Sequence, residues 1–245
     1  MSIIYINPYQ FAAPWSPAEI TTALWLDAAD ASTITESGGA VSQWDDKSGN
    51  SRNATSSSTS RPTYTANGLN NKPVVAFGGA QYMTFLGVHG SPWSIAIVGR
   101  ASNINQGFVQ FGVVNSSGAV FTESPALYRA RSAGNNSDAT AALVNNENVL
   151  LLASFSNAQN DIWKNGTQGT SIISPNAGAP TSNAASTLGG LSSTVYRLNG
   201  FIAEIIVLDG LFTGLLREQI EGYLAHKWGL TANLPAGHPY KIVAP

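Results

Sequence analysis

Short apolar runs separated by turn residues dominate the middle of this 245-residue chain. Between residues 73 and 201, runs of five to nine residues alternate with clusters of Gly, Asn and Ser. Such runs, rich in Val, Ile, Phe, Trp and Tyr, are typical of β-strands. No amphipathic helix separates them, so a doubly wound α/β fold is not expected. The pattern predicts an all-β fold, a two-sheet antiparallel jelly-roll sandwich.

Individual strands are predicted where a run of residues with high β propensity is bounded by turn residues. They are expected over residues 23–28, 73–78, 93–101, 107–114, 126–132, 149–156 and 201–209. Residues 161–173 are expected to form a hairpin, because Asn165-Gly166 supplies the positive φ angles of a type I′ turn.

One helix is expected over about residues 213–228, packed on the sandwich. Thr213 is a suitable N-cap, and Gly229 stands where helices commonly end. Arg217 and Glu221, four residues apart, are expected on the outer face. The apolar stripe that needs a partner consists of Leu216, Ile220, Tyr223, Leu224 and Trp228.

The composition narrows the function classes. Hydrophobic residues make up 43% of the chain and charged residues 11%, so a core can form while the surface is built from Ser, Thr, Asn and Gly. Twelve scattered basic residues and a net charge of −2 argue against nucleic-acid binding. The absence of Cys excludes disulfides and thiolate metal sites. The first residues lack a signal-peptide pattern, and no apolar run is long enough for membrane insertion.

The N-terminal segment differs in its residue pattern from the rest of the chain. Residues 1–15 are expected to form an arm and residues 16–245 the jelly-roll domain. The arm either packs on its own domain, docks on a neighbouring subunit or stays disordered. Its candidate docking residues are apolar or aromatic: Ile4, Tyr5, Ile6, Tyr9, Phe11 and Trp15.

The stretch VSQWDDKSGNSRNAT, residues 41–55, is the segment that looks most like a ligand-binding or catalytic site. Sugar recognition needs an aromatic face beside polar groups, which makes Trp44, Asp45, Asn50, Tyr82 and Trp163 the carbohydrate-binding candidates. Asp45, Asp46 and Asn50 also offer oxygen ligands for calcium. The alternative interpretation buries Trp44 in the core and uses the aspartates and Asn50 to hydrogen-bond a turn.

Catalytic patterns are not found. A glycosidase needs two carboxylates flanking the scissile bond, and Asp45 and Asp46, if on a strand, would face opposite sides. The three histidines, His89, His226 and His238, are far apart and are expected to be structural. No nucleophile elbow or phosphate-binding glycine motif is present. The chain is therefore not expected to be an enzyme.

Several segments of the sequence, taken in their order along the chain, resemble segments of a known family. They are ALWLDAADASTIT, VSQWDDKSGN, KPVVAFGG, a hairpin with a KNG turn, GFIAEIIVLDG, REQIEGYLAHKWGL and LPAGHPY. In this order the chain resembles the concanavalin A-like lectin/glucanase superfamily, in the laminin-G-like form common in bacteriophage and bacterial surface proteins. The resemblance covers roughly residues 20–241. It implies a jelly roll with the helix packed near one edge, and most often a binding or structural module.

The function expected from these features is that of a non-catalytic bacteriophage virion protein, a capsid decoration or tail accessory anchored through residues 1–15. Its partners would be other virion proteins, further copies of itself and, additionally, a cell-surface glycan. It would be assembled in the host cytoplasm. The alternatives are a carbohydrate-binding module of a host-recognition or bacterial surface protein, and a glycoside hydrolase. Calcium is the one cofactor that the residues allow.

Overall fold

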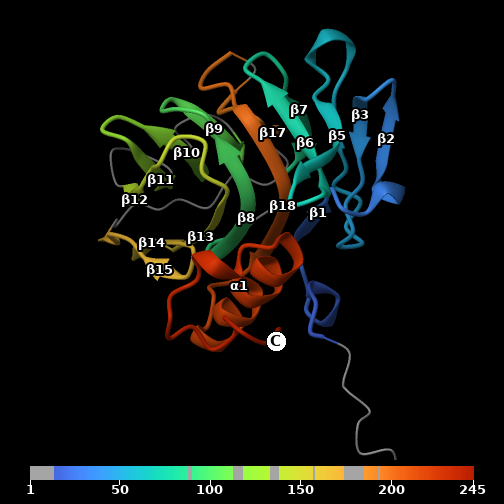
Figure 1. The fold of residues 1–245 in the computed structure, drawn as a ribbon. Coiled ribbons are helices and arrows are strands. Elements are labelled where there is room, and N and C mark those ends of the chain that lie inside the picture. Colours follow the sequence, from blue (N-terminus) through green and yellow to red (C-terminus); the bar gives the residue numbers. More distant parts are fainter. Residues whose placement is uncertain are drawn as a thin grey trace, which may run out of the picture.

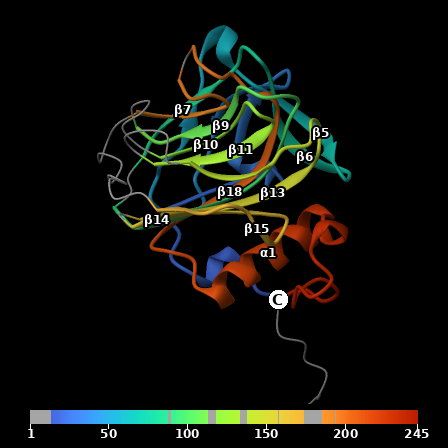
Figure 2. The same cartoon turned by 90° about the vertical axis from the view of Figure 1, so that its left-hand side faces the viewer.

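The computed structural model describes residues 14–87, 90–112, 118–132, 138–156, 158–173, 185–192 and 194–245. All named strand pairs in this part are antiparallel and form two layers (Figures 1 and 2). The first layer contains β1 (Leu24–Asp27), β5 (Thr63–Leu69), β6 (Lys72–Gly78), β8 (Trp93–Ala101), β13 (Val149–Phe155), β14 (Gln159–Lys164), β15 (Thr167–Gln168), β16 (Ile172–Ile173) and β18 (Asn199–Asp209).

The second layer faces the first across the core. It contains β4 (Ala54–Thr55), β7 (Met83–Leu86), β9 (Gln106–Gln110), β10 (Ala119–Glu123), β11 (Leu127–Arg131), β12 (Asp138–Ala142) and β17 (Ala185–Leu188). The hairpin of β2 (Ile34–Ser37) and β3 (Ala40–Trp44) joins the layers, because β3 pairs with both β4 and β5. The architecture confirms the predicted all-β sandwich.

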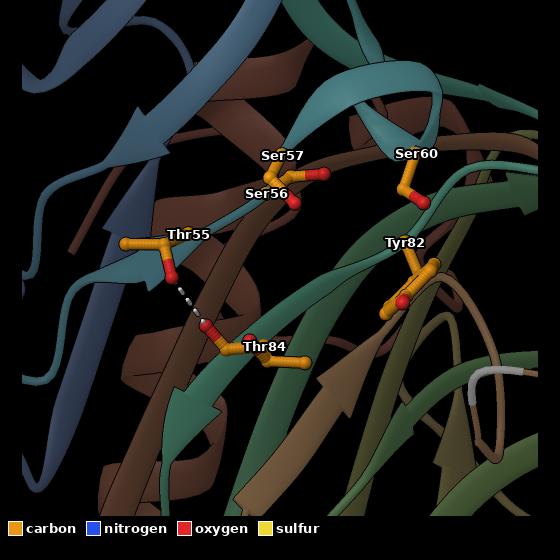
Figure 3. Close-up of a pocket in the computed structure, with 6 residues that line it drawn as sticks. All are labelled: Thr55, Ser56, Ser57, Ser60, Tyr82 and Thr84. Atoms are coloured by element: carbon orange, nitrogen blue, oxygen red, sulfur yellow. Dashed lines mark hydrogen bonds between the residues drawn. The ribbon is translucent and has the colours of Figure 1, made fainter.

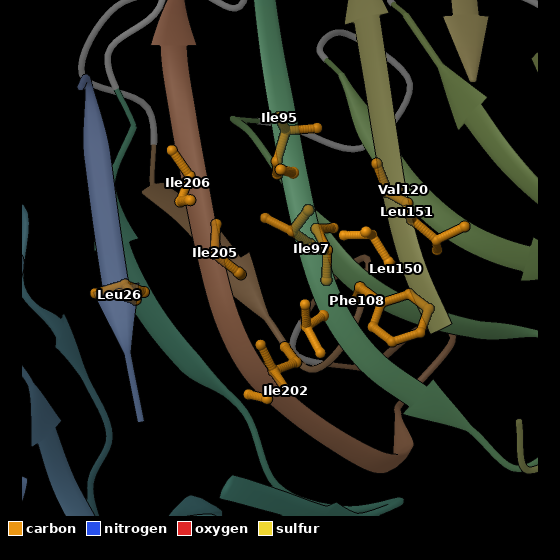
Figure 4. Packing of buried hydrophobic residues seen from close by; sticks show 14 of the residues in the cluster. Leu26, Ile95, Ile97, Phe108, Val120, Leu150, Leu151, Ile202, Ile205 and Ile206 are labelled. Carbon is orange, nitrogen blue, oxygen red and sulfur yellow. The ribbon is translucent and has the colours of Figure 1, made fainter. Parts of the chain in front are cut away.

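The core lies between the layers and continues under the helix. Strands β8, β13 and β18 are buried on both faces over most of their length. Ile97 and Ile205 of the first layer and Phe108 of the second belong to this core, and Figure 4 shows them among their buried neighbours. A Cβ added to Gly99 would lie 2.8 Å from the Phe108 ring, so only glycine lets the layers approach here. Each fully buried aliphatic or aromatic side chain of this kind contributes about 1.5–3 kcal/mol.

Helix α1 (Gly214–Trp228) covers the outer face of β8 and β13. Its predicted ends are confirmed: the Thr213 hydroxyl accepts from the Leu216 N–H, and Gly229 has a left-handed φ of 67°. From the predicted stripe, Ile220, Leu224 and Trp228 are fully buried. In the described part of the chain no helix has the length and apolar run needed to cross a bilayer.

The outer face predicted for Arg217 and Glu221 is wrong for Glu221. The Glu221 side chain is fully buried, and its Oε2 lies 2.6 Å from Arg217 Nη1 and 3.1 Å from His238 Nε2. The C-terminal tail wraps over this helix face, and His226 Nε2 lies 2.9 Å from the Tyr240 carbonyl oxygen. A face that a helical pattern marks as polar is therefore covered by the tail.

The chain ends that the structure describes meet beside α1. The Trp15 N–H donates to the Pro245 carbonyl oxygen at 2.9 Å, and the Trp15 ring lies edge-on to Tyr223, 6.0 Å between centroids. Trp15, predicted as the last docking residue of the arm, thus contacts its own chain. The other candidate arm residues lie outside the described residues; they are Ile4, Tyr5, Ile6, Tyr9 and Phe11.

Short 3-10 turns lie before, between and after the strands: η1 (Pro17–Glu19) precedes β1, η2 (Ala31–Thr33) and η3 (Ser58–Ser60) connect strands, and η4 (Thr231–Asn233) follows α1. The predicted strand 93–101 matches β8 residue for residue, and Asn165-Gly166 turns β14 into β15 with φ angles of 51° and 78°. The predicted strand 107–114 is too long: β9 ends at Gln110, Phe111 and Gly112 lie outside it, and residues 113–114 lie outside the described residues.

Candidate functional site: a hydroxyl-lined hollow beside Tyr82

The residues expected to bind sugar do not come together. Trp44 is 0% exposed, so its ring cannot act as a platform, and the interpretation that buries it is the correct one. Trp163 is half-buried against the core, with the Arg217 guanidinium of α1 5.6 Å from its ring centroid. Asp45 accepts from Gln43 Nε2 at 2.6 Å. Trp44 is therefore a packing residue, whereas Trp163 lies apart from it on β14 and only partly packs against the core.

Asp46 shapes the loop after β3. Its Oδ1 accepts from the backbone N–H groups of Trp25 and Ser48 at 3.0 and 2.9 Å. Its Oδ2 accepts from the Ser48 hydroxyl at 2.7 Å and from the Arg52 N–H at 3.1 Å. The amide nitrogen of Asn50 donates to the carbonyl oxygens of Thr22 and Ala23. These are the contacts of the turn network, with the carboxylate tying the loop to β1.

In the described residues, no three His, Cys, Asp or Glu side chains are grouped so that they could hold a metal ion. The calcium set expected from the sequence combined Asp45, Asp46 and Asn50. Because both Asp46 oxygens already accept two hydrogen bonds each, they do not fit an ion that takes six to eight oxygen ligands.

Of the aromatic residues predicted to bind sugar, Tyr82 lines a hollow. The hollow measures about 200 Å³, and five residues with hydroxyl side chains line it with the Tyr82 ring. These residues are Thr55, Ser56, Ser57, Ser60 and Thr84 (Figure 3). We call it the Tyr82 hollow.

Strand pairing assembles the Tyr82 hollow from two distant segments. Thr55 of β4 pairs with Thr84 of β7, and the Thr55 hydroxyl lies 3.5 Å from the Thr84 carbonyl oxygen, as the dashed line in Figure 3 marks. The Tyr82 N–H donates to the Ser60 carbonyl oxygen at 3.0 Å. The turn η3 and the start of β7 are thus held against each other.

Arg197 fixes the tyrosine ring. Its guanidinium carbon lies 4.1 Å from the centroid of Tyr82, and its Nη1 donates to the Gln81 carbonyl oxygen at 3.1 Å. A cation–π contact of this kind is worth about 0.5–2 kcal/mol. The ring that lines the hollow is therefore held in place before any ligand arrives, which lowers the entropy cost of binding.

The Ser56 hydroxyl is the most informative atom of the Tyr82 hollow. Its Oγ is buried and has no hydrogen-bond partner among the described residues. Leaving such a group unpaired costs about 1–3 kcal/mol. A ligand hydroxyl at this position would satisfy it, so the hollow favours a partner that carries hydroxyl groups.

A smaller hollow continues the first one. It measures about 170 Å³ and shares Thr55 and Thr84 with the Tyr82 hollow. Its remaining lining residues are Asn53, Phe85, Leu86 and Ala185, of which Leu86 is 58% exposed. The two hollows flank the β4–β7 pair, so a chain of two or more linked units fits them better than a single small ring does.

The chemistry of this surface is that of binding. Apart from the Tyr82 phenol, the lining of both hollows contains no titratable side chain. It therefore offers no carboxylate or imidazole for general acid–base catalysis. Hydroxyl and amide groups beside an aromatic ring are suited to a neutral, polyhydroxylated ligand.

A pair of carboxylates that no spacing in the sequence marks does meet elsewhere. Asp27 of β1 and Glu204 of β18 are cross-strand partners, and Lys227 Nζ lies 2.7 and 2.8 Å from their oxygens. Burial raises the pKa of the Glu204 carboxyl, while Lys227 opposes the shift. The carboxylates are 4% and 0% exposed, which leaves a sugar no access to them.

The Glu204 carboxylate instead holds α1 on the sheet. It accepts hydrogen bonds from Trp25 Nε1, Trp228 Nε1 and the Tyr223 hydroxyl at 2.8, 2.6 and 3.1 Å. Asp27 in turn pairs with Lys47 Nζ at 3.0 Å, in the loop that follows β3. The network links two strands, the helix and the loop, and its role is structural.

No protein-family model and no curated protein matches the chain. Solved structures do. The binding domain of botulinum neurotoxin DC in complex with SialylT has a TM-score of 0.59 at 11% identity, over 83% of this chain and 52% of that one. Botulinum neurotoxin type C, whose cell entry depends on two ganglioside molecules, has a TM-score of 0.60 at 12% identity, over 85% and 53%.

A third structure is covered almost completely. Domain 4 of AbnA, a GH43 extracellular arabinanase from Geobacillus stearothermophilus, solved with arabinotriose, has a TM-score of 0.54 at 14% identity, over 70% of this chain and 89% of that one. The chain spans about half the length of the two toxin structures. At these identities the likeness defines architecture only. The chain has the lectin-like jelly-roll fold shared by these binding domains.

Proposed function

We propose that this chain is a non-catalytic carbohydrate-binding module whose site is the Tyr82 hollow. The observation that carries the proposal is the set of hydroxyl side chains around one fixed aromatic ring, with the buried Ser56 hydroxyl still unpaired among the described residues. A stacked sugar ring and its hydroxyl groups would meet both requirements.

The ligand that fits is a neutral oligosaccharide of at least two units. Thr55 and Thr84 would contact both units, because they line both hollows. Support for a glycan also comes from the structures of the same fold, which were solved with SialylT and with arabinotriose. Their low identity leaves the choice of sugar to experiment.

Replacing the ring tests the proposal. A glycan array with the full chain identifies a ligand, and calorimetry then gives its Kd with each variant. Tyr82→Ala is expected to weaken binding about two- to twelvefold, since an aromatic contact is worth about 0.5–1.5 kcal/mol. Ser60→Ala removes one lining hydroxyl, and its matched control is Thr59→Ala in the same turn, which does not line the hollow.

Two results would contradict the proposal. One is silence across the array at high protein concentration. The other is a ligand whose Kd is the same for the unmodified chain, Tyr82→Ala and Ser60→Ala. The melting temperature of each variant must equal that of the unmodified chain, so that a loss of binding is not mistaken for a loss of folding.

The biological setting that we propose is a bacteriophage virion, where the module would act as a capsid decoration or tail accessory protein. Its support is the low charge of the chain and the sequence resemblance given above. Residues 1–13 would anchor it to virion proteins or to further copies of itself. Deleting them should abolish incorporation into particles and leave the melting temperature unchanged, whereas normal incorporation of the shortened chain would contradict this role.

A further inference from the structure

Another hollow lies where the C-terminal end of α1 meets two hairpin turns. It measures about 560 Å³ and is lined mainly by carboxamide side chains. Four asparagines contribute them: Asn70, Asn148, Asn165 and Asn233. We call it the asparagine hollow.

Two of these asparagines occupy backbone positions with left-handed φ angles. Asn70, at the β5–β6 turn with φ 48°, donates its amide to the carbonyl oxygens of Trp228 and Gly229 at 2.7 and 3.1 Å. A Cβ on Gly229 would lie 2.8 Å from the same amide nitrogen. Asn165 accepts the Leu150 N–H on its Oδ1 at 2.9 Å. Each of these two side chains is therefore held by one end.

The asparagine hollow carries no net charge. Glu147 and Lys164 both line it, and they pair with each other at 2.7 Å. Lys164 Nζ also donates to the Ala142 carbonyl oxygen at 2.8 Å, and Glu147 Oε1 accepts the Val144 N–H at 3.0 Å. With both charges occupied, a strongly charged ligand gains nothing here.

Hydrogen-bonding groups remain unused within the part of the chain that the structure describes. Asn148 Oδ1 is buried without a partner, which costs about 1–3 kcal/mol. The fixed ends of Asn70 and Asn165 leave an amide oxygen and an amide nitrogen respectively for another molecule. The asparagine hollow thus offers both donors and acceptors in fixed positions.

We propose that the asparagine hollow is a second ligand site, for a neutral saccharide. A pyranose or furanose presents adjacent hydroxyl groups, each both donor and acceptor, and these match paired carboxamides. A peptide would also meet the amides, but peptide recognition uses pockets for side chains, and the lining here is mainly polar.

The asparagine hollow is separate from the Tyr82 hollow. Strand β5 leads from the neighbourhood of Ser60 to Asn70, and its seven residues span roughly 23 Å at about 3.3 Å per residue. The inference goes beyond the proposed function and stands whether or not the Tyr82 hollow binds glycan.

The test is a nuclear magnetic resonance titration of the full chain carrying Tyr82→Ala, so that binding at the first site is weakened and the signals of the asparagine hollow report on the second. The probes are maltotriose, cellotriose, xylotriose, arabinotriose and, for comparison, triglycine. At least one sugar, at up to about 20 mM, should shift the side-chain amide signals of Asn148 and Asn165. Asn148→Ala and Asn233→Ala should each weaken that binding at least about fivefold, and Asn103→Ala, an exposed asparagine outside the hollow, should not.

The inference is overturned if no sugar shifts these signals, or if triglycine shifts them and the sugars do not. It is also overturned if Asn103→Ala weakens binding as much as Asn148→Ala. Failure of this site with intact Tyr82-dependent binding would leave the proposed function standing. Sugar-induced shifts of the asparagine amide signals, without any Tyr82-dependent binding, would support the second site and contradict the proposed function.

Discussion

At the scale of single residues, Asp46 and Ser56 differ in whether their oxygens are already occupied. The Asp46 carboxylate accepts four hydrogen bonds from its own chain, whereas the buried Ser56 hydroxyl has no partner among the described residues. The sequence showed that residues 45–50 could form a turn network. It could not show that Ser56 would be left unpaired, because that depends on where β7 lies.

The occupied carboxylate predicts the response to metal removal. A chelator should leave the melting temperature unchanged, because Asp46 has no oxygen lone pair to spare for calcium. Asp46→Ala should lower the unfolding free energy by about 2–4 kcal/mol, since three partly buried N–H groups and a hydroxyl lose their acceptor. Melting curves and urea titrations measure both, and a rise in melting temperature on adding calcium would contradict the first expectation.

Asp30 predicts a pH dependence. Its hydrogen bond from Lys47, 2.8 Å away, and those from Ser32 lower the pKa of the carboxyl from 3.8 to about 2. A depressed pKa stabilises the fold above pH 3.8, and this contribution is lost as the pH falls through about 2. Asp30→Asn should flatten this part of the stability curve. Because the pair is partly exposed, the effect should stay below about 1 kcal/mol and shrink in high salt.

At the scale of elements, the attachment of α1 combines a local signal with a long-range one. Thr213, Gly229 and the apolar stripe are readable from the sequence, since they depend on neighbours within a few turns. The burial of Glu221 is not readable in this way. It follows from the path of the C-terminal tail, which brings His238 over the helix.

The anchoring of α1 predicts a specific loss. Trp228→Phe keeps the six-membered ring but removes the five-membered ring with the N–H that donates to the buried Glu204 carboxylate at 2.6 Å. A hydrogen bond to a charged group is worth about 1.5–3 kcal/mol, so the unfolding free energy should fall by at least that amount, because the lost ring also leaves a cavity. Urea titration measures it. Tyr223→Phe, which removes the longer 3.1 Å bond to the same carboxylate, should cost less, and the opposite order would contradict this account.

At the scale of the whole molecule, the positions of the strands along the sequence were predictable, but which strands lie next to each other was not. Runs such as residues 93–101 carry their own signal, because β propensity and turn residues are local. The Tyr82 hollow depends on the pairing of Thr55 with Thr84, and the asparagine hollow on Asn70 reaching Gly229. No periodicity in the sequence marks either contact. The serine-rich run 55–60 was the only local signal, and it is also typical of an ordinary loop.

The contact between Trp15 and Pro245 has a consequence for how the chain can be reconnected. Because the Trp15 N–H donates directly to the Pro245 carbonyl oxygen, a short Gly-Ser linker can join residue 245 to residue 14 without displacing either. New ends can then be opened at the β2–β3 turn, Gly38-Gly39, which lines neither the Tyr82 hollow nor the asparagine hollow. A circular permutant of this kind should melt cooperatively, which would show that the order in which the strands are synthesised is not needed to specify the sandwich.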